Sequence, residues 1–147
     1  MFEKNFSKKQ EKINGREALV IKTGGAYSLD DTFLCGQCFR YEEVTRENGY
    51  VEYFTVVGDL LVFVGQRERG ELIFYGVDEE TFDAALCDYF DLRTDYAAIK
   101  RDVLKSFDSP FLSLAAKSAE GIAILRQEPW ETICSFIISQ NTRKTFL

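Results

Sequence analysis

The chain has 147 residues, of which 46% are hydrophobic and 14% aromatic, enough for one globular domain or for one domain and a piece of another. No apolar run approaches the roughly 20 residues of a membrane-spanning helix, and the polar residues 1–12 lack the apolar core of a signal peptide. These features predict a soluble, cytoplasmic protein (nuclear in a eukaryote) with no membrane contact. The net charge of −6 argues against a free-standing nucleic-acid-binding domain, because such domains are usually basic.

Four cysteines raise the question of metal or redox chemistry, because Cys35 and Cys38 form a Cys-x-x-Cys pair. A structural zinc site needs four ligands. The chain has no histidine, and Cys87 and Cys134 each lie singly in an apolar helical pattern, where buried cysteine is common. A thioredoxin-like site would place the first cysteine at a helix N-terminus, but an alternating, strand-like pattern follows Cys38. We therefore expect no metal and no cofactor, and thiol redox chemistry remains a third alternative.

The first half of the chain has the period of two that is typical of strands, interrupted by turn signals such as Asn48-Gly49 and Gly58-Asp59. It predicts an antiparallel meander of about five strands. The extended segments are residues 18–22, 27–34, 39–44, 51–57, 60–66 and 71–75, with a break at Gly36 between the second and third.

The period then changes to that of helices. Asp78 is a suitable N-cap for a first helix, Thr94 or Asp95 for a second, and Ser109-Pro110 opens a third. A run of strands followed by a run of helices predicts an α+β fold, a twisted antiparallel sheet with helices packed on one face.

A fourth helix begins at Pro129, where the missing N–H of proline costs nothing. Its apolar residues cover a broad arc, so it is predicted to be buried, and it ends in the polar sequence Ser139-Gln140-Asn141. The chain stops six residues later. A buried helix with nothing after it to cover it leads us to expect a chain cut in mid-domain.

Three segments together resemble one family. Residues 28–41 contain the sequence Cys35-Gly36-Gln37-Cys38-Phe39-Arg40, residues 124–131 read Ile-Leu-Arg-Gln-Glu-Pro-Trp-Glu, and residues 135–141 read Ser-Phe-Ile-Ile-Ser-Gln-Asn. In this order they resemble the 8-oxoguanine DNA glycosylases, from about Tyr27 to Arg143. The likeness is to the family's N-terminal domain and to the first helix of its catalytic domain.

The resemblance implies a TATA-binding-protein-like sheet domain followed by the start of an all-helical, helix-hairpin-helix catalytic domain. We therefore divide the chain into a polar N-terminal segment (1–16), the sheet domain (17–123) and the first helix of a truncated catalytic domain (124–147). The family flips 8-oxoguanine paired with cytosine out of double-stranded DNA and removes it through a lysine Schiff base, with an aspartate assisting. That lysine and aspartate lie beyond the matched segments, so no catalytic residue is assigned here. The family is a DNA glycosylase and AP lyase of base excision repair, whereas activity of this chain itself stays open.

The resemblance also implies roles for three residues. The glycine matching Gly36 accepts a hydrogen bond from N7–H of the lesion through its carbonyl, so Gly36 is the candidate lesion-base-binding residue. The asparagine matching Asn141 fills the gap left by the flipped base, and Arg143 is a candidate for a DNA phosphate contact. Taken alone, each has a plainer reading: a turn glycine, a helix C-cap and a solvated charge.

Three neighbouring residues are predicted to be structural. Gln37 and Phe39 are read as structural, since Phe39 alternates into the sheet core, and Arg126 is read as an ion-pair or cap residue. The residues 144–147 depart from the family pattern.

Two functions from different classes thus compete. The first is the N-terminal part of an 8-oxoguanine DNA glycosylase, which shapes the lesion pocket and binds DNA that carries 8-oxoguanine opposite cytosine. The alternative is a non-catalytic α+β interaction module or truncated product without activity. The residue matches favour the first, and the net charge of −6 favours the second.

Overall fold

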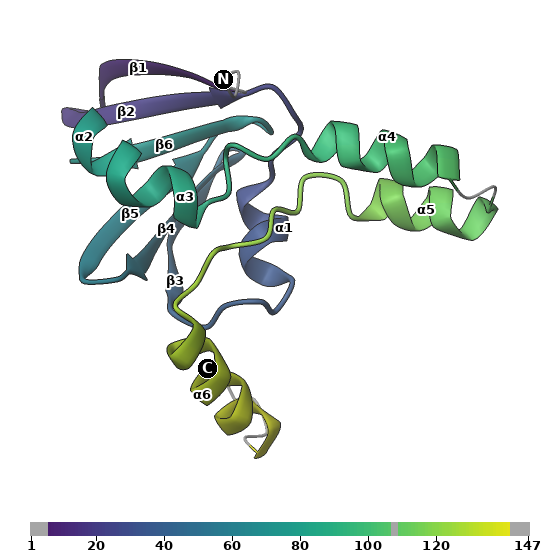
Figure 1. Cartoon of the computed structure of the whole chain (residues 1–147). Coiled ribbons are helices and arrows are strands. Elements are labelled where there is room, and N and C mark those ends of the chain that lie inside the picture. Colours follow the sequence, from purple (N-terminus) through teal and green to yellow (C-terminus); the bar gives the residue numbers. More distant parts are fainter. Residues whose placement is uncertain (1–5, 107–108, 142–147) are drawn as a thin grey trace.

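The computed structural model of the chain describes residues 6–106 and 109–141, and their side chains up to Gln140. Its centre is a six-stranded antiparallel sheet with the strand order β1-β2-β6-β5-β4-β3 (Figure 1). The strands are β1 (Phe6–Ile13), β2 (Arg16–Thr23), β3 (Tyr41–Glu47), β4 (Tyr50–Val57), β5 (Leu60–Gln66) and β6 (Glu71–Tyr75). The α+β class predicted from the change of period is confirmed.

Two of the hairpins turn on an Asn-Gly pair. Asn14 and Gly15 have φ of 50° and 81°, and Asn48 and Gly49 have φ of 50° and 82°. Positive φ at both central residues is the turn geometry whose twist matches that of the flanking strands. The Asn48-Gly49 turn was predicted; the β1–β2 hairpin was not, because β1 is a polar edge strand whose side chains are mostly exposed or half-buried.

Residues 27–34 were predicted to be extended, and this was wrong. Leu29–Leu34 form helix α1, and the Asp31 N–H donates to the Ser28 hydroxyl at 3.1 Å as in an N-cap. Asp30 and Asp31 place negative charge in the first helical turn, which stabilises it. The buried residues Leu29 and Phe33 are four apart, which is a helical and not a strand spacing.

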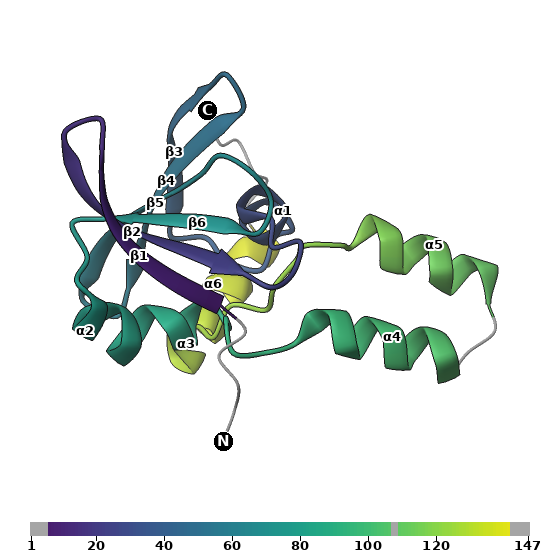
Figure 2. The ribbon, with the colours of Figure 1, turned by 90° about the horizontal axis from the view of Figure 1, so that it is seen from above.

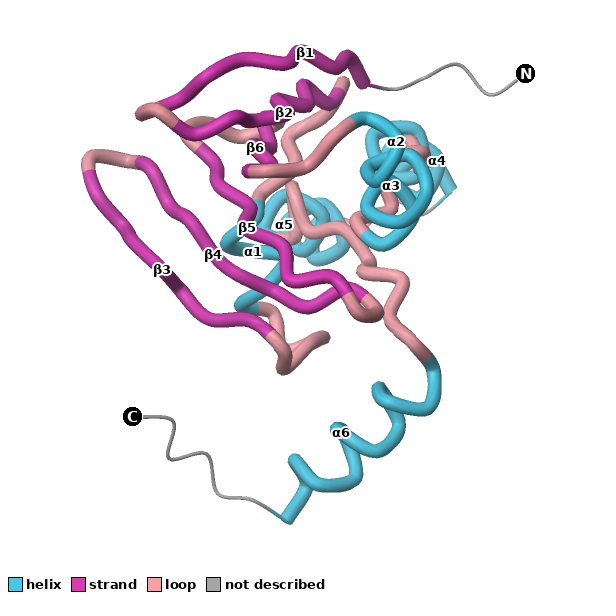
Figure 3. Tube along the Cα trace, turned by 90° about the vertical axis from the view of Figure 1, so that its left-hand side faces the viewer, coloured by secondary structure: helices cyan, strands magenta, loops and turns pink. Residues whose placement is uncertain are grey.

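The helix predicted after Asp78 is one continuous segment of α2 (Glu79–Thr81), the π-helical turn η1 (Phe82–Leu86) and α3 (Cys87–Tyr89). The Asp78 carboxylate accepts from the Thr81 N–H at 2.7 Å. This segment and α1 lie on the same side of the sheet (Figure 3). Their contact is aromatic: the Phe90 ring lies 6.2 Å from the ring of Phe33 and 5.2 Å from that of Phe74 in β6.

The opposite face of the sheet carries a smaller apolar cluster of Ala18, Val20, Ile73 and Tyr75. No described helix covers it (Figure 3). The Arg16 guanidinium instead lies 3.7 Å from the centre of the Tyr75 ring and pairs with the buried carboxylate of Glu52 at 2.8 Å. Side chains from the sheet itself thus shield this face, and the predicted packing of helices on one face is confirmed.

Helices α4 (Tyr96–Ser106) and α5 (Pro110–Ser118) run side by side and project away from the sheet (Figures 1 and 2). Asp95, and not Thr94, caps α4, since its carboxylate accepts from the Ala98 N–H at 2.8 Å. Ser109 caps α5 with Pro110 in its first turn.

Helix α6 (Pro129–Asn141) begins at the predicted proline but is not buried. None of its residues from Pro129 to Gln140 is buried, and Trp130 and Ile138 keep 72% and 66% of their surface exposed. It extends from the sheet near β3 and the β4–β5 turn (Figures 1 and 3). The prediction failed because a broad apolar arc indicates that a surface will be covered, but the described chain provides no element that covers it.

Candidate functional site

The turn that follows α1 presents Gly36 to solvent. Helix α1 ends at Leu34 with Cys35 as its C-cap, and Gly36 has φ of +88°, a left-handed conformation that non-glycine residues rarely adopt. A Cβ atom placed on Gly36 would meet nothing within 4 Å. The glycine is therefore needed for the backbone angle, and the space above it is open to a ligand.

The Gln37 side chain fastens this turn to a distant part of the chain. Its amide nitrogen donates to the carbonyls of Thr32 and Ala123, both at 2.8 Å, and its amide oxygen accepts from the Leu125 N–H at 2.9 Å. We refer to these three hydrogen bonds as the Gln37 clamp. Gln37 was predicted to be structural, and the clamp confirms it.

Two further contacts connect the turn to the start of α6. Gln127 donates from its side chain to the Gln37 carbonyl at 2.6 Å, two residues before Pro129. The Arg40 guanidinium pairs with Glu131 in the first turn of α6. The Gly36 turn and α6, almost a hundred residues apart in sequence, are thus held side by side.

Phe39 contributes to the same contact. It was predicted to enter the sheet core, but its ring is half-buried and meets that of Phe136 in α6 edge-on at 5.2 Å. Phe39 precedes the start of β3 at Tyr41, so the alternation of the strand does not set its direction. The prediction that Phe39 enters the sheet core was therefore wrong, while its ring contact with Phe136 agrees with the predicted structural role.

The other candidate residues lie at or beyond the end of α6. Asn141 is the last residue of α6, at the end away from the sheet (Figure 1), and its side chain is outside the described part. Arg143 lies outside the described residues. The structure therefore brings Gly36 and the start of α6 together and leaves the two predicted DNA contacts untested.

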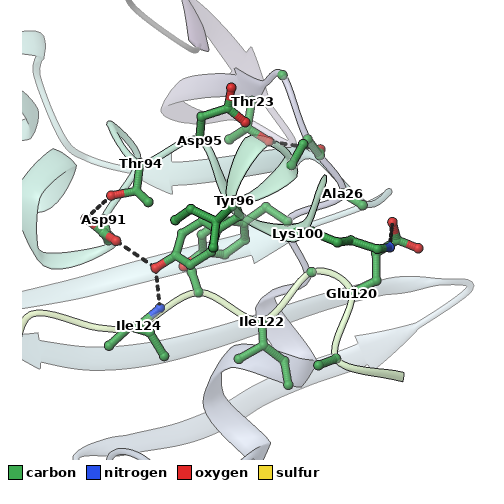
Figure 4. A pocket seen from close by; sticks show the side chains of 18 of the residues that line it. Thr23, Ala26, Asp91, Thr94, Asp95, Tyr96, Lys100, Glu120, Ile122 and Ile124 are labelled. Carbon is green, nitrogen blue, oxygen red and sulfur yellow. Dashed lines mark hydrogen bonds and ion pairs between the residues drawn. The ribbon is translucent and has the colours of Figure 1, made fainter. Parts of the chain in front are cut away.

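Arg126 is held in an ion pair, as predicted. Its guanidinium lies 2.8 Å from the Asp91 carboxylate, which also accepts from the Tyr96 hydroxyl at 2.6 Å. The Tyr96 hydroxyl in turn accepts from the Ile124 N–H at 2.7 Å (Figure 4). Partial burial and the neighbouring Asp91 carboxylate raise the pKa of Tyr96 to about 12, so it is a neutral donor at physiological pH. This network fixes the segment that carries the clamp residues.

Two of the cavities in the described part of the chain lie away from the Gly36 turn. One of about 440 Å³ lies between the α4–α5 pair and residues 23–27 after β2, and Tyr96, Lys100 and Glu120 are among the residues that line it (Figure 4). The other, about 220 Å³, lies between the β4–β5 turn, α3 and the start of α6. Gly36 lines neither, so the turn acts as an open surface.

The arrangement of the cysteines does not resemble that of a redox active site or of a metal site. Cys35 stands at the C-terminal end of α1, the opposite end from the reactive cysteine of a thioredoxin-like protein. Cys38 is buried in the main core. Within residues 6–106 and 109–141, no three His, Cys, Asp or Glu side chains come together so that they could hold a metal ion. Nor is any helix of this described part long and apolar enough to cross a membrane.

Sequence comparison identifies the relatives of the chain. A family model described as the N-terminal domain of 8-oxoguanine DNA glycosylase matches residues 19–133. The N-glycosylase/DNA lyase OGG1 of Arabidopsis thaliana is 28% identical over 118 residues, which are 78% of this chain and 31% of the relative. The N-glycosylase/DNA lyase of Saccharomyces cerevisiae is 31% identical over 126 residues, with 77% of this chain and 31% of the relative covered.

Solved structures agree in fold as well as in sequence. The apo form of the Clostridium acetobutylicum 8-oxoguanine glycosylase/lyase superposes with a TM-score of 0.76 at 33% identity, covering 95% of this chain and 45% of that one. The same enzyme bound to double-stranded DNA with cytosine opposite 8-oxoguanine gives 0.76 at 34% identity, covering 95% and 44%. MBOgg1 with a low-affinity DNA ligand gives 0.74 at 37% identity, covering 93% and 44%.

The chain spans about a third of the length of the curated relatives and less than half that of the solved ones. Its likeness extends over the sheet domain, the Gly36 turn and the start of α6. Because the family model covers residues 19–133, most of the sequence, the chain belongs to the family of 8-oxoguanine DNA glycosylase N-terminal domains.

Proposed function

We propose that this chain is the N-terminal part of an 8-oxoguanine DNA glycosylase and AP lyase, and that it forms one wall of the lesion pocket. Its substrate is double-stranded DNA that carries 8-oxoguanine opposite cytosine, as in the DNA complex of the Clostridium acetobutylicum enzyme. The observation that carries the proposal is the clamped Gly36 turn beside α6. We propose that the protein acts in the cytoplasm, or in the nucleus of a eukaryote.

Gly36 reads the lesion through its backbone carbonyl. Guanine presents an acceptor at N7, whereas 8-oxoguanine carries a hydrogen there and is a donor. A carbonyl oxygen therefore attracts the N7–H of 8-oxoguanine and repels the N7 of guanine. The open space above Gly36 supports this role, because a base can approach the backbone without meeting a side chain.

Asn141 at the end of α6 and Arg143, two residues later in the sequence, carry the DNA contacts in this proposal. Asn141 fills the gap that the flipped base leaves in the duplex, and Arg143 contacts a backbone phosphate. The net charge of −6 is compatible with a few such contacts, provided that the rest of the protein supplies the positive field.

The proposal also keeps the division of the chain at residue 124. Residues 17–123 form the sheet domain, to which the polar segment 1–16 contributes β1, and residues 124–147 begin a helical domain. We assign the lysine chemistry to the part of the relatives that this chain does not match.

A domain exchange tests the proposal. Residues 1–141 replace the corresponding part of the Clostridium acetobutylicum enzyme, and excision of 8-oxoguanine opposite cytosine is measured on a labelled duplex. We expect the chimera to excise 8-oxoguanine and to spare guanine. A folded chimera that binds the duplex but does not distinguish the two bases would favour the non-catalytic interaction module.

A further inference from the structure

Two free thiols flank the candidate lesion-reading turn. Cys35 is exposed at the end of α1, and Cys38 is buried in the main core with 4% of its surface exposed. The chain bends at the two residues between them, Gly36 and Gln37. Two cysteines with this spacing around a bend can join in a disulfide, as in other Cys-x-x-Cys motifs.

The Cys35 sulfur contacts two groups that take part in the Gln37 clamp. It donates to the Thr32 carbonyl at 3.3 Å and accepts from the Gln37 amide nitrogen at 3.4 Å. That same nitrogen donates to the carbonyls of Thr32 and Ala123. The two carbonyls use both hydrogens of this amide, so the sulfur is a weak third contact; the clamp is tied to the thiol pair because Gln37 lies between the two cysteines in the chain.

The two thiols share one neighbourhood. Burial, and secondly the adjacent Cys35 thiol, raise the pKa of Cys38 to about 12. Both cysteines also contribute to the raised pKa of Tyr41, whose main cause is burial. Cys35 is exposed and is therefore the sulfur that an oxidant in solution can reach, whereas Cys38 is buried.

We propose that Cys35 and Cys38 are an oxidation site, at which a hydroperoxide converts the two thiols into a disulfide that loosens the Gln37 clamp. The effect on lesion reading rests on the function proposed above. The formation of the disulfide and the loosening of the Gln37 clamp do not depend on that function.

The reaction balances in two steps. The Cys35 sulfur attacks one oxygen of the hydroperoxide, the O–O bond breaks, and the alcohol or water that leaves takes up the thiol proton, which gives a sulfenic acid. The Cys38 sulfur then attacks the Cys35 sulfur, the S–O bond breaks, and hydroxide leaves as water with the Cys38 proton. Each sulfur loses one electron, and the peroxide is reduced by two. Cys35 is exposed and Cys38 is buried, so joining them has to move at least one of the two side chains, and with it the turn between them.

This site differs from a redox enzyme. The reactive cysteine of a thioredoxin-like enzyme stands at a helix N-terminus, whereas Cys35 is the C-cap of α1. The proposed oxidation happens once per chain and is reversed by a reductant. Cys134 in α6, half-buried and remote in sequence from the pair, supplies a matched control.

The test uses the 147-residue chain and hydrogen peroxide. Intact mass should show the loss of two hydrogens, and peptide mapping should find Cys35 joined to Cys38, both reversed by dithiothreitol. The Cys134→Ser variant should behave like the parent, whereas Cys35→Ser and Cys38→Ser should form no such link. Exchange of the Leu125 amide hydrogen, which bonds to the Gln37 side chain, should become about fivefold faster in the oxidised parent and not in peroxide-treated Cys35→Ser.

Two results would overturn the proposal. One is oxidation that adds oxygen to Cys35 without linking it to Cys38. The other is a disulfide that leaves the exchange of the Leu125 amide hydrogen unchanged, because forming the disulfide would then not loosen the Gln37 clamp. In the domain-exchange chimera, oxidation should slow 8-oxoguanine excision at least fivefold, and Cys38→Ser should prevent this. A chimera inactive when reduced would count against the proposed function, whereas the mass and exchange results judge the oxidation site separately.

Discussion

At the scale of single residues, Gln37 does more than its place in the sequence indicated. Its side chain makes three hydrogen bonds to groups from Thr32 to Leu125. The sequence suggested a supporting residue, but the partners lie up to 88 residues away, and no local pattern encodes such a pairing. Gly36 was singled out through the resemblance to the family, whereas the local pattern alone indicated only a turn glycine.

Replacing Gln37 should therefore destabilise the chain. Gln37→Ala leaves two carbonyls and one N–H in the partly buried turn without their partner, at a cost of about 1–3 kcal/mol in the free energy of unfolding. Urea unfolding measures it, with Gln10→Ala on the exposed edge strand β1 as the matched control. If both variants lose the same small amount, the clamp does not stabilise the turn.

Asp30 should give the chain a distinct response to acid. The Arg46 guanidinium donates to its carboxylate at 2.7 and 3.1 Å and the Tyr53 hydroxyl at 2.7 Å, and these bonds hold the pKa of Asp30 below its ordinary value of 3.8. The stabilisation from a lowered carboxyl pKa is complete above the unfolded pKa and disappears as the pH falls through the folded one.

Asp30→Asn should consequently be less stable than the parent at pH 7, and the two should converge below about pH 4. Thermal unfolding across this pH range measures the difference. The control is Asp59→Asn, in the exposed turn between β4 and β5. A constant gap between Asp30→Asn and the parent at every pH would show that the ion pair is not its source.

At the scale of elements, the sequence predicted helix ends better than it distinguished α1 from a strand. Asp78, Ser109 and Pro129 begin helices as expected, because caps and N-terminal prolines act within one turn. The segment 27–34 was assigned wrongly because it is short and lies between Gly24-Gly25 and Gly36. Its pattern of apolar and polar residues is compatible with a helix or with a strand. The Ser28 cap with two acidic residues behind it was the signal that decides for a helix.

Helix α6 should make the purified chain associate with itself. Trp130, Ile133, Ile137 and Ile138 each expose more than half of their surface, an apolar patch of the kind that drives association. Ile137→Gln should weaken self-association about tenfold, the effect of one buried aliphatic side chain.

Light scattering over a concentration series measures this association. Leu61→Gln on β5 is the matched control, because Leu61 is 61% exposed and Ile137 is 60%. A parent chain that stays monomeric at every concentration, or equal effects of the two variants, would show that α6 is not the associating surface.

At the scale of the whole molecule, composition and period were sufficient for the α+β class but not for the arrangement of its parts. The sheet has six strands and not about five, because β1 is polar and its pairing with β2 depends on the Asn14-Gly15 turn. The burial expected for α6 needed a partner surface, which the described chain lacks. What the sequence could convey was the set of residues shared with the family, from the Gly36 turn to the start of α6.

The central claim is that the Gly36 carbonyl, positioned by the clamp, reads the lesion. The most direct measurement compares Gly36→Ala with Gly49→Ala in the domain-exchange chimera, on a duplex with 8-oxoguanine and on one with a base-less site. Both glycines have positive φ, 88° and 82°, and a Cβ atom added to either would meet nothing within 4 Å, so the backbone strain is matched. Gly36→Ala should lose at least tenfold in excision of 8-oxoguanine while it keeps cleavage at the base-less site, and Gly49→Ala should keep both. Equal losses of Gly36→Ala on the two substrates would contradict the account and leave Gly36 with a role in the fold alone.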